Sequence, residues 1–138
     1  MKVHTTNYEN TLIAIADDCP VTKAEVPPAK GEAKTVAGLQ YDLLSNHPPY
    51  TFTSDDLLFR VYAHRNDLTE SELEAGRTQF FSKGQPCLRA SPLTKRYGWG
   101  IHSDKDGKIA LVGCETPAYE RLAQDDTVKV VKAMKSAR

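Results

Sequence analysis

The sequence has few cysteines and no long apolar run. Its three cysteines, Cys19, Cys87 and Cys114, are odd in number and far apart, and none forms a Cys-x-x-Cys pair. This pattern suggests neither a disulfide framework nor a zinc ribbon, so we expect free thiols in a reducing compartment. No apolar run approaches the ~18 residues of a membrane span, and the first residues lack the apolar region of a signal peptide. These absences predict a cytoplasmic protein that does not enter a membrane.

A net charge is absent too, because 18 Lys and Arg residues balance 18 Asp and Glu residues. A neutral chain exerts little long-range attraction on nucleic acid or on an anionic membrane. The content of 40% hydrophobic and 26% charged residues is ordinary for a folded protein and excludes a disordered or fibrous chain. At 138 residues the chain is long enough to bury one core, and we expect a single globular domain over residues 1–138.

Familiar metal-binding and phosphate-binding motifs are missing as well. The histidines lie too far apart for a helical pair of ligands, and neither a His-Glu-x-x-His motif nor a glycine-rich phosphate loop is present. Residues 104–107 resemble part of a calcium loop, but with Gly107 at the sixth position the twelfth is Gly113, where such a loop needs Glu. We therefore expect no metal and no cofactor, and we interpret residues 104–107 as a turn.

The clearest structural signal is a hairpin over about residues 99–113. Apolar side chains alternate with polar or small ones in residues 99–103 and 108–113, as they do in strands with one buried face. Between these runs, the Asp106-Gly107 pair favours a tight reversal of the chain.

The other elements mix helices and strands without strict alternation. Residues 54–65 fit a helix or a strand, and residues 127–135 fit a strand, which we favour, or a helix. The mixture predicts an α+β fold: a small antiparallel sheet, which includes the hairpin, packed by three to five helices. The remaining predicted elements are strands at 11–16 and 87–90, helices at 35–45, at 70–82 and from Thr116, and a long loop at 17–34. This loop is a candidate lid over a pocket, but a covering loop with no role is the commoner case.

Basic and aromatic side chains are concentrated before and within the hairpin. Residues 77–102 contain five basic residues and no carboxylate. Ser91 is suited to cap a short helix, whose free N–H groups would attract an anion, and the aromatic rings offer surfaces for stacking. This stretch predicts a binding surface for a small anionic molecule or a partner. The predicted site residues are Arg89, Ser91, Lys95, Arg96, Tyr97, Trp99 and His102.

Other interpretations of the same stretch stay open. The commoner role of residues such as Tyr97 and Trp99 is in the core, with the bases on a solvated face. His102 could instead serve an enzyme as acid or base, with Cys87 or Cys114 as nucleophile, although no nucleophile motif is present. The bases and rings could also hold single-stranded nucleic acid, which the zero net charge makes less favourable than a small anion.

The chain contains four distinctive stretches: HTTNYENTLI, KTVAGLQYDLL, YTFTSDDLLF and FFSKGQPCLRASPLTKRYGWGIHSDKDGKIAL. Together, and above all through the run SPLTKRYGWGIHSD, they resemble a family of small, mostly bacterial proteins catalogued as a domain of unknown function. The likeness covers nearly the whole chain and implies a free-standing cytosolic domain. It implies no activity, cofactor or partner, so no site residue is carried over from it.

Overall fold

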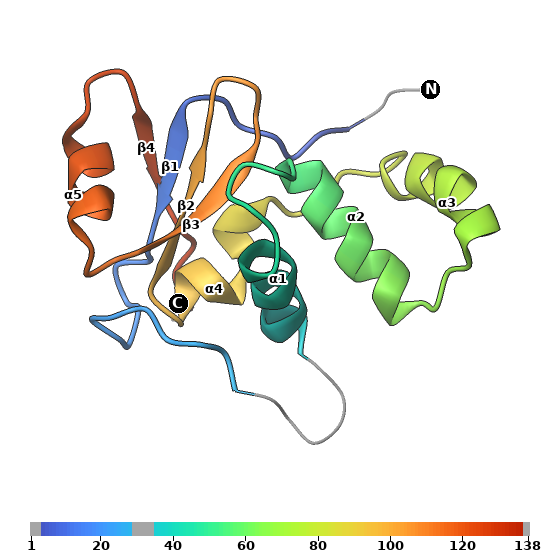
Figure 1. The fold of residues 1–138 in the computed structure, drawn as a ribbon, viewed down its shortest axis with the longest axis horizontal. Helices are drawn as coiled ribbons and strands as arrows, with labels where there is room; N and C mark the ends of the chain where they lie inside the picture. The colour runs from blue at the N-terminus through green and yellow to red at the C-terminus, as the bar shows by residue number, and fades with distance from the viewer. Residues whose placement is uncertain (1–3, 29–34, 137–138) are drawn as a thin grey trace.

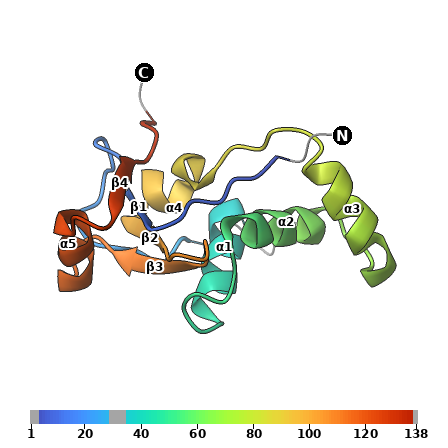
Figure 2. The ribbon, with the colours of Figure 1, turned by 90° about the horizontal axis from the view of Figure 1, so that it is seen from above.

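The computed structural model describes residues 4–28 and 35–136. In chain order the elements are β1 (Thr11–Ala14), α1 (Val36–Ser45), α2 (Ser54–Arg65), the 3₁₀-helix η1 (Glu70–Glu72), α3 (Leu73–Phe80), the 3₁₀-helix η2 (Leu88–Ala90), α4 (Pro92–Lys95), β2 (Trp99–Ser103), β3 (Ile109–Gly113), α5 (Pro117–Gln124) and β4 (Lys129–Lys132). The sheet lies between α5 and the group of α1, α2 and α4 (Figure 1). Seen from above, α3 is at the end of the molecule farthest from α5 (Figure 2).

The sheet has the strand order β3-β2-β1-β4, so the first strand of the chain lies in its centre. β1 pairs antiparallel with β2, and β2 pairs antiparallel with β3, which confirms the hairpin. β4, however, pairs parallel with β1. The α+β class is confirmed, with five α-helices in the described residues, but the sheet is mixed, and the prediction of an antiparallel sheet is wrong for β4. The crossover through α5 returns the chain in the direction of β3, and that direction is parallel to β1.

The two ambiguous segments are now assigned, and one predicted strand is wrong. Residues 54–65 form α2, and the strand within residues 127–135 is β4. Residues 87–90, predicted as a strand, instead form η2, because Ala90 and Ser91 donate backbone hydrogen bonds back to Cys87 and Leu88, both of 3.0 Å. Of the helices within residues 4–28 and 35–136, none is both long enough and apolar enough to cross a membrane.

One face of the sheet is buried by α1, α2 and η2. Ile13 of β1 and Ile101 of β2 are at most 1% exposed and pack with Leu57 of α2 and Leu88 of η2. These four side chains belong to the main core cluster of the protein. The alternation of apolar residues predicted for residues 99–103 therefore corresponds to this buried face of the sheet.

The opposite face of the sheet is covered by α5. A Cβ atom placed on Gly100 would lie 2.6 Å from the Tyr119 ring, so only glycine lets the ring of α5 lie this close to β2. The Tyr119 hydroxyl accepts a hydrogen bond of 3.0 Å from the backbone N–H of Ile15. This contact fastens α5 to the end of β1 and so positions the crossover that leads to β4.

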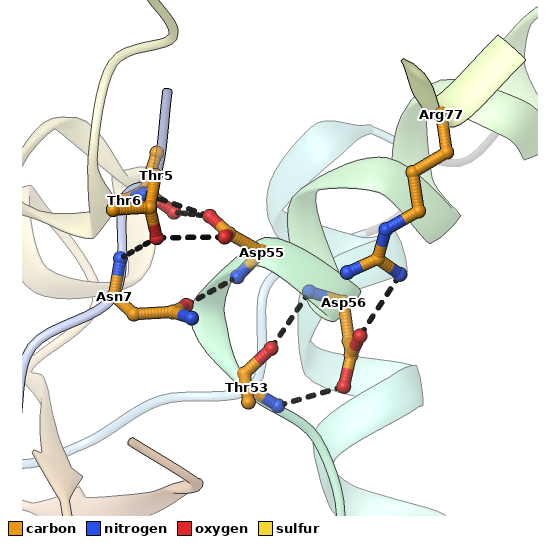
Figure 3. A network of polar contacts seen from close by, with 7 residues as sticks. All are labelled: Thr5, Thr6, Asn7, Thr53, Asp55, Asp56 and Arg77. Carbon is orange, nitrogen blue, oxygen red and sulfur yellow. Dashed lines mark hydrogen bonds and ion pairs between the residues drawn. The ribbon is translucent and has the colours of Figure 1, made fainter. Parts of the chain in front are cut away.

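The N-terminal segment is tied to the first turn of α2 by polar contacts (Figure 3). The Asp55 carboxylate accepts hydrogen bonds of 2.7 Å from the hydroxyls of Thr5 and Thr6 and from the Thr6 backbone N–H. In return, the backbone N–H of Asp55 donates to the Asn7 side chain at 2.9 Å. The acidic residue in the first turn of α2 thus holds residues 5–7 beside the helix, which suits the positive end of the helix dipole.

A capping box explains why residues 54–65 are a helix. The Thr53 hydroxyl accepts from the Asp56 backbone N–H, and the Asp56 carboxylate accepts from the Thr53 backbone N–H, each at 3.1 Å. The same carboxylate forms an ion pair of 2.9 Å with Arg77, which joins α3 to α2 (Figure 3). Partial burial raises the pKa of Asp56, but the hydrogen bonds from Thr53 and the charge of Arg77 outweigh it, so the pKa lies below its ordinary value.

We predict that replacing Ile101 by Ala lowers the free energy of unfolding by about 2–5 kcal/mol, because the side chain is fully buried and its loss leaves a cavity. Chemical denaturation measures this change. The control is Val130→Ala on β4, where the side chain is 40% exposed and the change should stay within about 0.5 kcal/mol. Equal losses in both variants would contradict the assignment of the core.

We predict that the ion pair between Asp56 and Arg77 makes stability depend on acidic pH. Because folding lowers the pKa of Asp56, its contribution is present above the ordinary value of 3.8 and is lost as the pH falls below it. The difference in unfolding free energy between the protein and Asp56→Asn should therefore shrink as the pH falls below 3.8. The Arg77→Gln variant tests the partner. Because Arg77 also lies over the Phe59 and Phe81 rings, it should add some loss to Asp56→Asn, but the two losses should be less than additive, and full additivity would argue against the pairing.

Candidate functional site

The seven predicted site residues do not form one surface, and four of them make contacts that hold the fold together: Arg89, Ser91, Tyr97 and Trp99. Arg89 donates from Nε to the backbone oxygen of Lys132 at 2.6 Å, and its own carbonyl accepts from the Met134 N–H at 2.8 Å. Arg89 thereby fastens the end of β4 beside η2. One N–H of its guanidinium is therefore used in a contact that stabilises the fold.

Ser91 is the N-cap of α4, as predicted, but it does not face solvent. It is only 4% exposed, its oxygen accepts from the Leu93 N–H at 3.1 Å, and its hydroxyl donates to the side-chain oxygen of Gln40 at 2.5 Å. The buried Ser91 side chain thus joins α4 to α1. The predicted anion site at this helix end lacks geometric support, because the capping hydroxyl already takes the Leu93 N–H and α4 has only four residues.

Tyr97 and Trp99 hold the described part of the long loop. The Tyr97 carbonyl accepts from the Glu25 N–H at 2.9 Å, and the Trp99 indole donates to the Glu25 carbonyl at 2.8 Å. Trp99 also packs against Tyr41 of α1, with ring centroids 5.6 Å apart. The loop as predicted, residues 17–34, includes residues 29–34, which lie outside the described residues. The described part is fastened to the start of β2.

The two remaining bases and the histidine lie apart from these contacts. Lys95 is half-buried in the last turn of α4, and Arg96 is exposed directly after it. His102 is on the α5 face of β2 and shares a hydrogen bond of 2.8 Å with the Tyr50 hydroxyl. Whether Lys95 and Arg96 bind a ligand stays a prediction.

His102 is held in its neutral form near pH 7. Burial lowers its pKa, and the nearby negative charges of Asp104 and Asp125 oppose this effect without cancelling it. Burial also raises the pKa of Tyr50, with Asp104 adding to the shift. The pair can therefore exchange a hydrogen bond but carries no net charge at neutral pH.

The cysteines make their contacts elsewhere. In the described residues the Cys87 thiol lies 3.3 Å from the Tyr8 hydroxyl, and the Cys114 thiol donates to the Thr22 carbonyl at 3.4 Å. His102 bonds to Tyr50 instead. The contacts of residues 4–28 and 35–136 thus give no support to the predicted alternative of a Cys–His pair. Among the same residues, no three His, Cys, Asp or Glu side chains gather as a metal site would require.

A pocket of about 530 Å³ lies between α1, α2 and the segment that precedes α4, and we call it the Gln40 pocket. Most of its walls are apolar or aromatic. Gln40 and Ser91 are the buried polar residues among those that line it. The described lining residues are Val36, Gln40, Leu58, Val61, Tyr62, Arg65, Asn66, Phe80, Gln85, Pro86, Cys87, Leu88, Ala90, Ser91 and Pro92.

Gln40 has hydrogen-bonding capacity that the protein does not use. The side chain is only 2% exposed, and its oxygen accepts the one proton of the Ser91 hydroxyl. No acceptor among the described residues takes its amide N–H groups. In the described part of the chain, every fully buried side-chain nitrogen or oxygen has a hydrogen-bond partner. The Gln40 nitrogen has none there, so it is not fully buried and is open to the pocket that Gln40 lines. It presents up to two donors there.

A second groove, of about 670 Å³, lies between α1, α2 and α3. Its polar lining residues are all exposed or half-buried. Two of its cations have partners within the protein: Arg77 pairs with Asp56, and Arg60 lies over the Phe52 ring at 4.7 Å. The groove is larger than the Gln40 pocket, but no buried polar group in the described residues points to a ligand there.

Sequence reasoning missed Gln40, although a signal existed. In the predicted helix at residues 35–45, position 40 falls one turn after Val36 on the apolar side, next to Leu39 and Leu43. A polar residue on an apolar stripe needs a partner or a function. Its partner Ser91 comes from a distant part of the chain, so the pairing was not visible in the sequence.

We predict that His102 titrates below its ordinary value of 6.5, which NMR of the imidazole signals measures directly. Because the folded state disfavours the charged form, the unfolded state binds the proton more readily, and stability falls as the pH drops from 6.5 to the lowered pKa. This part of the pH dependence should vanish in His102→Gln. A titration midpoint above 6.5 would contradict the burial of the ring.

Comparison with known proteins gives a family but no relative of known activity. No curated protein and no solved structure matches the chain. A family model described as a family of unknown function, DUF6157, matches residues 3–138, and this agrees with the resemblance of the four quoted stretches. The match spans the sheet, the helices and the Gln40 pocket. The chain therefore belongs to the family of unknown function DUF6157.

Proposed function

We propose that the protein binds a small molecule in the Gln40 pocket. The observation that carries this proposal is the Gln40 amide, which is 2% exposed, oriented by Ser91 and without an acceptor among the described residues. The amide nitrogen is open to the pocket, so a ligand that supplies an acceptor there gains a hydrogen bond worth about 0.5–1.5 kcal/mol. An apolar pocket with a few convergent polar groups is the usual form of a small-molecule site.

The Gln40 pocket suits a ligand better than the surface predicted at residues 89–102 does. The Nε of Arg89, the backbone carbonyl of Tyr97 and the indole N–H of Trp99, all from that surface, are used in contacts within the protein. Ser91 belongs to both sites, but in the pocket it orients Gln40 rather than capping an anion. The proposal therefore keeps the predicted class of function, binding of a small molecule. It assigns this function to the Gln40 pocket instead of the surface at residues 89–102.

The cytoplasm is the proposed place of action. The three cysteines are free and half-buried, and thiols of this kind persist in a reducing compartment. A single-stranded nucleic acid fits the pocket less well than a small molecule does, because Arg65 is the only basic side chain among its described lining residues.

We predict that a bound molecule protects Cys87 from alkylation, because this thiol lines the pocket whereas Cys19 and Cys114 do not. Millimolar panels of small aromatic and aliphatic acids, amides and ketones serve as probes, and mass spectrometry after iodoacetamide treatment reports each thiol. A probe at about ten times its Kd should slow the reaction of Cys87 by about tenfold and leave the other two unchanged.

Two variants test where the probe binds. Ala90→Phe places a ring at the pocket wall and should abolish the protection of Cys87. Lys95→Ala combined with Arg96→Ala removes two charges outside the pocket lining and should preserve it. Protection lost only in the double variant would move the site to the predicted basic surface. No protection by any member of the panel would contradict the proposed function.

A further inference from the structure

The polar groups of the Gln40 pocket indicate which chemistry its ligand carries, an inference that rests on the proposed function. At the buried end, the Ser91 hydroxyl proton is committed to Gln40 and the Ser91 oxygen accepts from Leu93. The amide N–H groups of Gln40 are therefore the donors that remain there. They are neutral, and among the described residues no cation lines this end.

A carboxylate would have no charged partner among the described residues at that end. Burying an ionised group without a charged partner weakens binding by much more than one neutral hydrogen bond strengthens it. An uncharged carbonyl oxygen requires much less desolvation and still satisfies the Gln40 amide. The magnitudes therefore favour a ketone, ester or amide oxygen over a carboxylate at the buried end.

The mouth of the pocket has the opposite character. Arg65, in the last turn of α2, is exposed and is the only charged residue among the described residues of the lining. Asn66 and Gln85, also in the lining, donate their amide groups to the Tyr62 and Phe80 carbonyls, at 2.8 Å each. The charge at this end thus comes from one guanidinium, which favours an anion that stays in contact with water.

The remaining lining of the pocket is mostly hydrophobic. Leu88 is fully buried and Val61 nearly so, and the rings of Phe80 and Tyr62 lie 4.7 Å apart. Such walls suit an aliphatic or aromatic body. We infer that the ligand has an uncharged carbonyl oxygen at the buried end, bound by Gln40, an apolar body, and an anionic group at the mouth beside Arg65.

Three matched probes test the inference. 4-Acetylbenzoate carries the carbonyl, the ring and the anion; 4-isopropylbenzoate replaces the carbonyl group by a hydrocarbon of the same shape; 4-methylacetophenone lacks the anion. NMR titration of the intact ¹⁵N-labelled protein gives each Kd and reports the Gln40 side-chain amide signals directly. We expect 4-isopropylbenzoate to bind about tenfold more weakly than 4-acetylbenzoate, because it leaves the Gln40 amide unpaired.

Variants separate the two polar ends. Gln40→Met keeps the size of the side chain and removes the donors, so the preference for acetyl over isopropyl should fall to about one. Arg65→Gln should abolish the roughly threefold advantage of 4-acetylbenzoate over 4-methylacetophenone. Gln79→Met, the same exchange at an exposed residue of α3 outside the lining, should leave both ratios unchanged. Thermal unfolding checks that each variant is folded, and the ratios remain valid even if absolute affinity falls.

The outcomes distinguish the two proposals. If the probes bind in the pocket but the isopropyl compound binds as tightly as the acetyl compound, the carbonyl assignment is overturned and the binding function stands. If Arg65→Gln leaves the advantage of 4-acetylbenzoate over 4-methylacetophenone intact, the placement of the anionic group beside Arg65 is overturned. If none of the three probes shifts the Gln40 signals, the inference is overturned, and the cysteine protection panel then decides whether the pocket binds another class of molecule.

Discussion

The burial of β1 on both faces is the constraint on which the rest of the structure depends. Every residue of Thr11–Ala14 is buried, and the strand pairs with β2 on one side and β4 on the other. All of its strand partners come from the last third of the chain, so the intervening helices must be accommodated before the sheet can close. Of these, α1, α2 and η2 cover one face of the sheet, and α5, which follows β3, covers the other.

The Gln40 pocket is a consequence of that arrangement. The backbone N–H of Ala16, just after β1, donates to the Thr94 carbonyl of α4 at 3.0 Å. Thr94 is fully buried, and Ser91 in front of it reaches Gln40 of α1. One wall of the pocket is thus anchored to the central strand and the other to α1, so the orientation of the Gln40 amide follows from the closure of the sheet.

The basic–aromatic stretch shows how composition and geometry can diverge. Its residues are close in sequence and look like one surface, yet Arg89 fastens β4, Trp99 fastens the loop at Glu25, and His102 lies on the other face of the sheet. Alternation along β2 sends neighbouring side chains to opposite faces, so a cluster in the sequence is divided in space. The contacts of Trp99 fit the structural role that is commoner for such a residue. Ligand binding by Lys95 and Arg96 stays a prediction.

The sequence by itself determined the features that depend on neighbours in the chain. The Asp106-Gly107 turn, the alternation of residues 99–103 and the N-cap at Ser91 act over a few residues, and all three are present as predicted. The α+β class followed from the same local patterns. Sequence order alone could not show that residues 87–90 would curl into a 3₁₀-helix, because both states satisfy the local preferences of that segment.

Only the tertiary structure decided the direction of β4, the partner of Ser91 and the partner of His102. Each depends on two segments that meet after the core has formed: β4 with β1, Ser91 with Gln40, and His102 with Tyr50. Such pairings are selected by which surfaces bury the most apolar area and leave the fewest polar groups unsatisfied. No residue carries that information alone, which is why the candidate site became visible only in the folded chain.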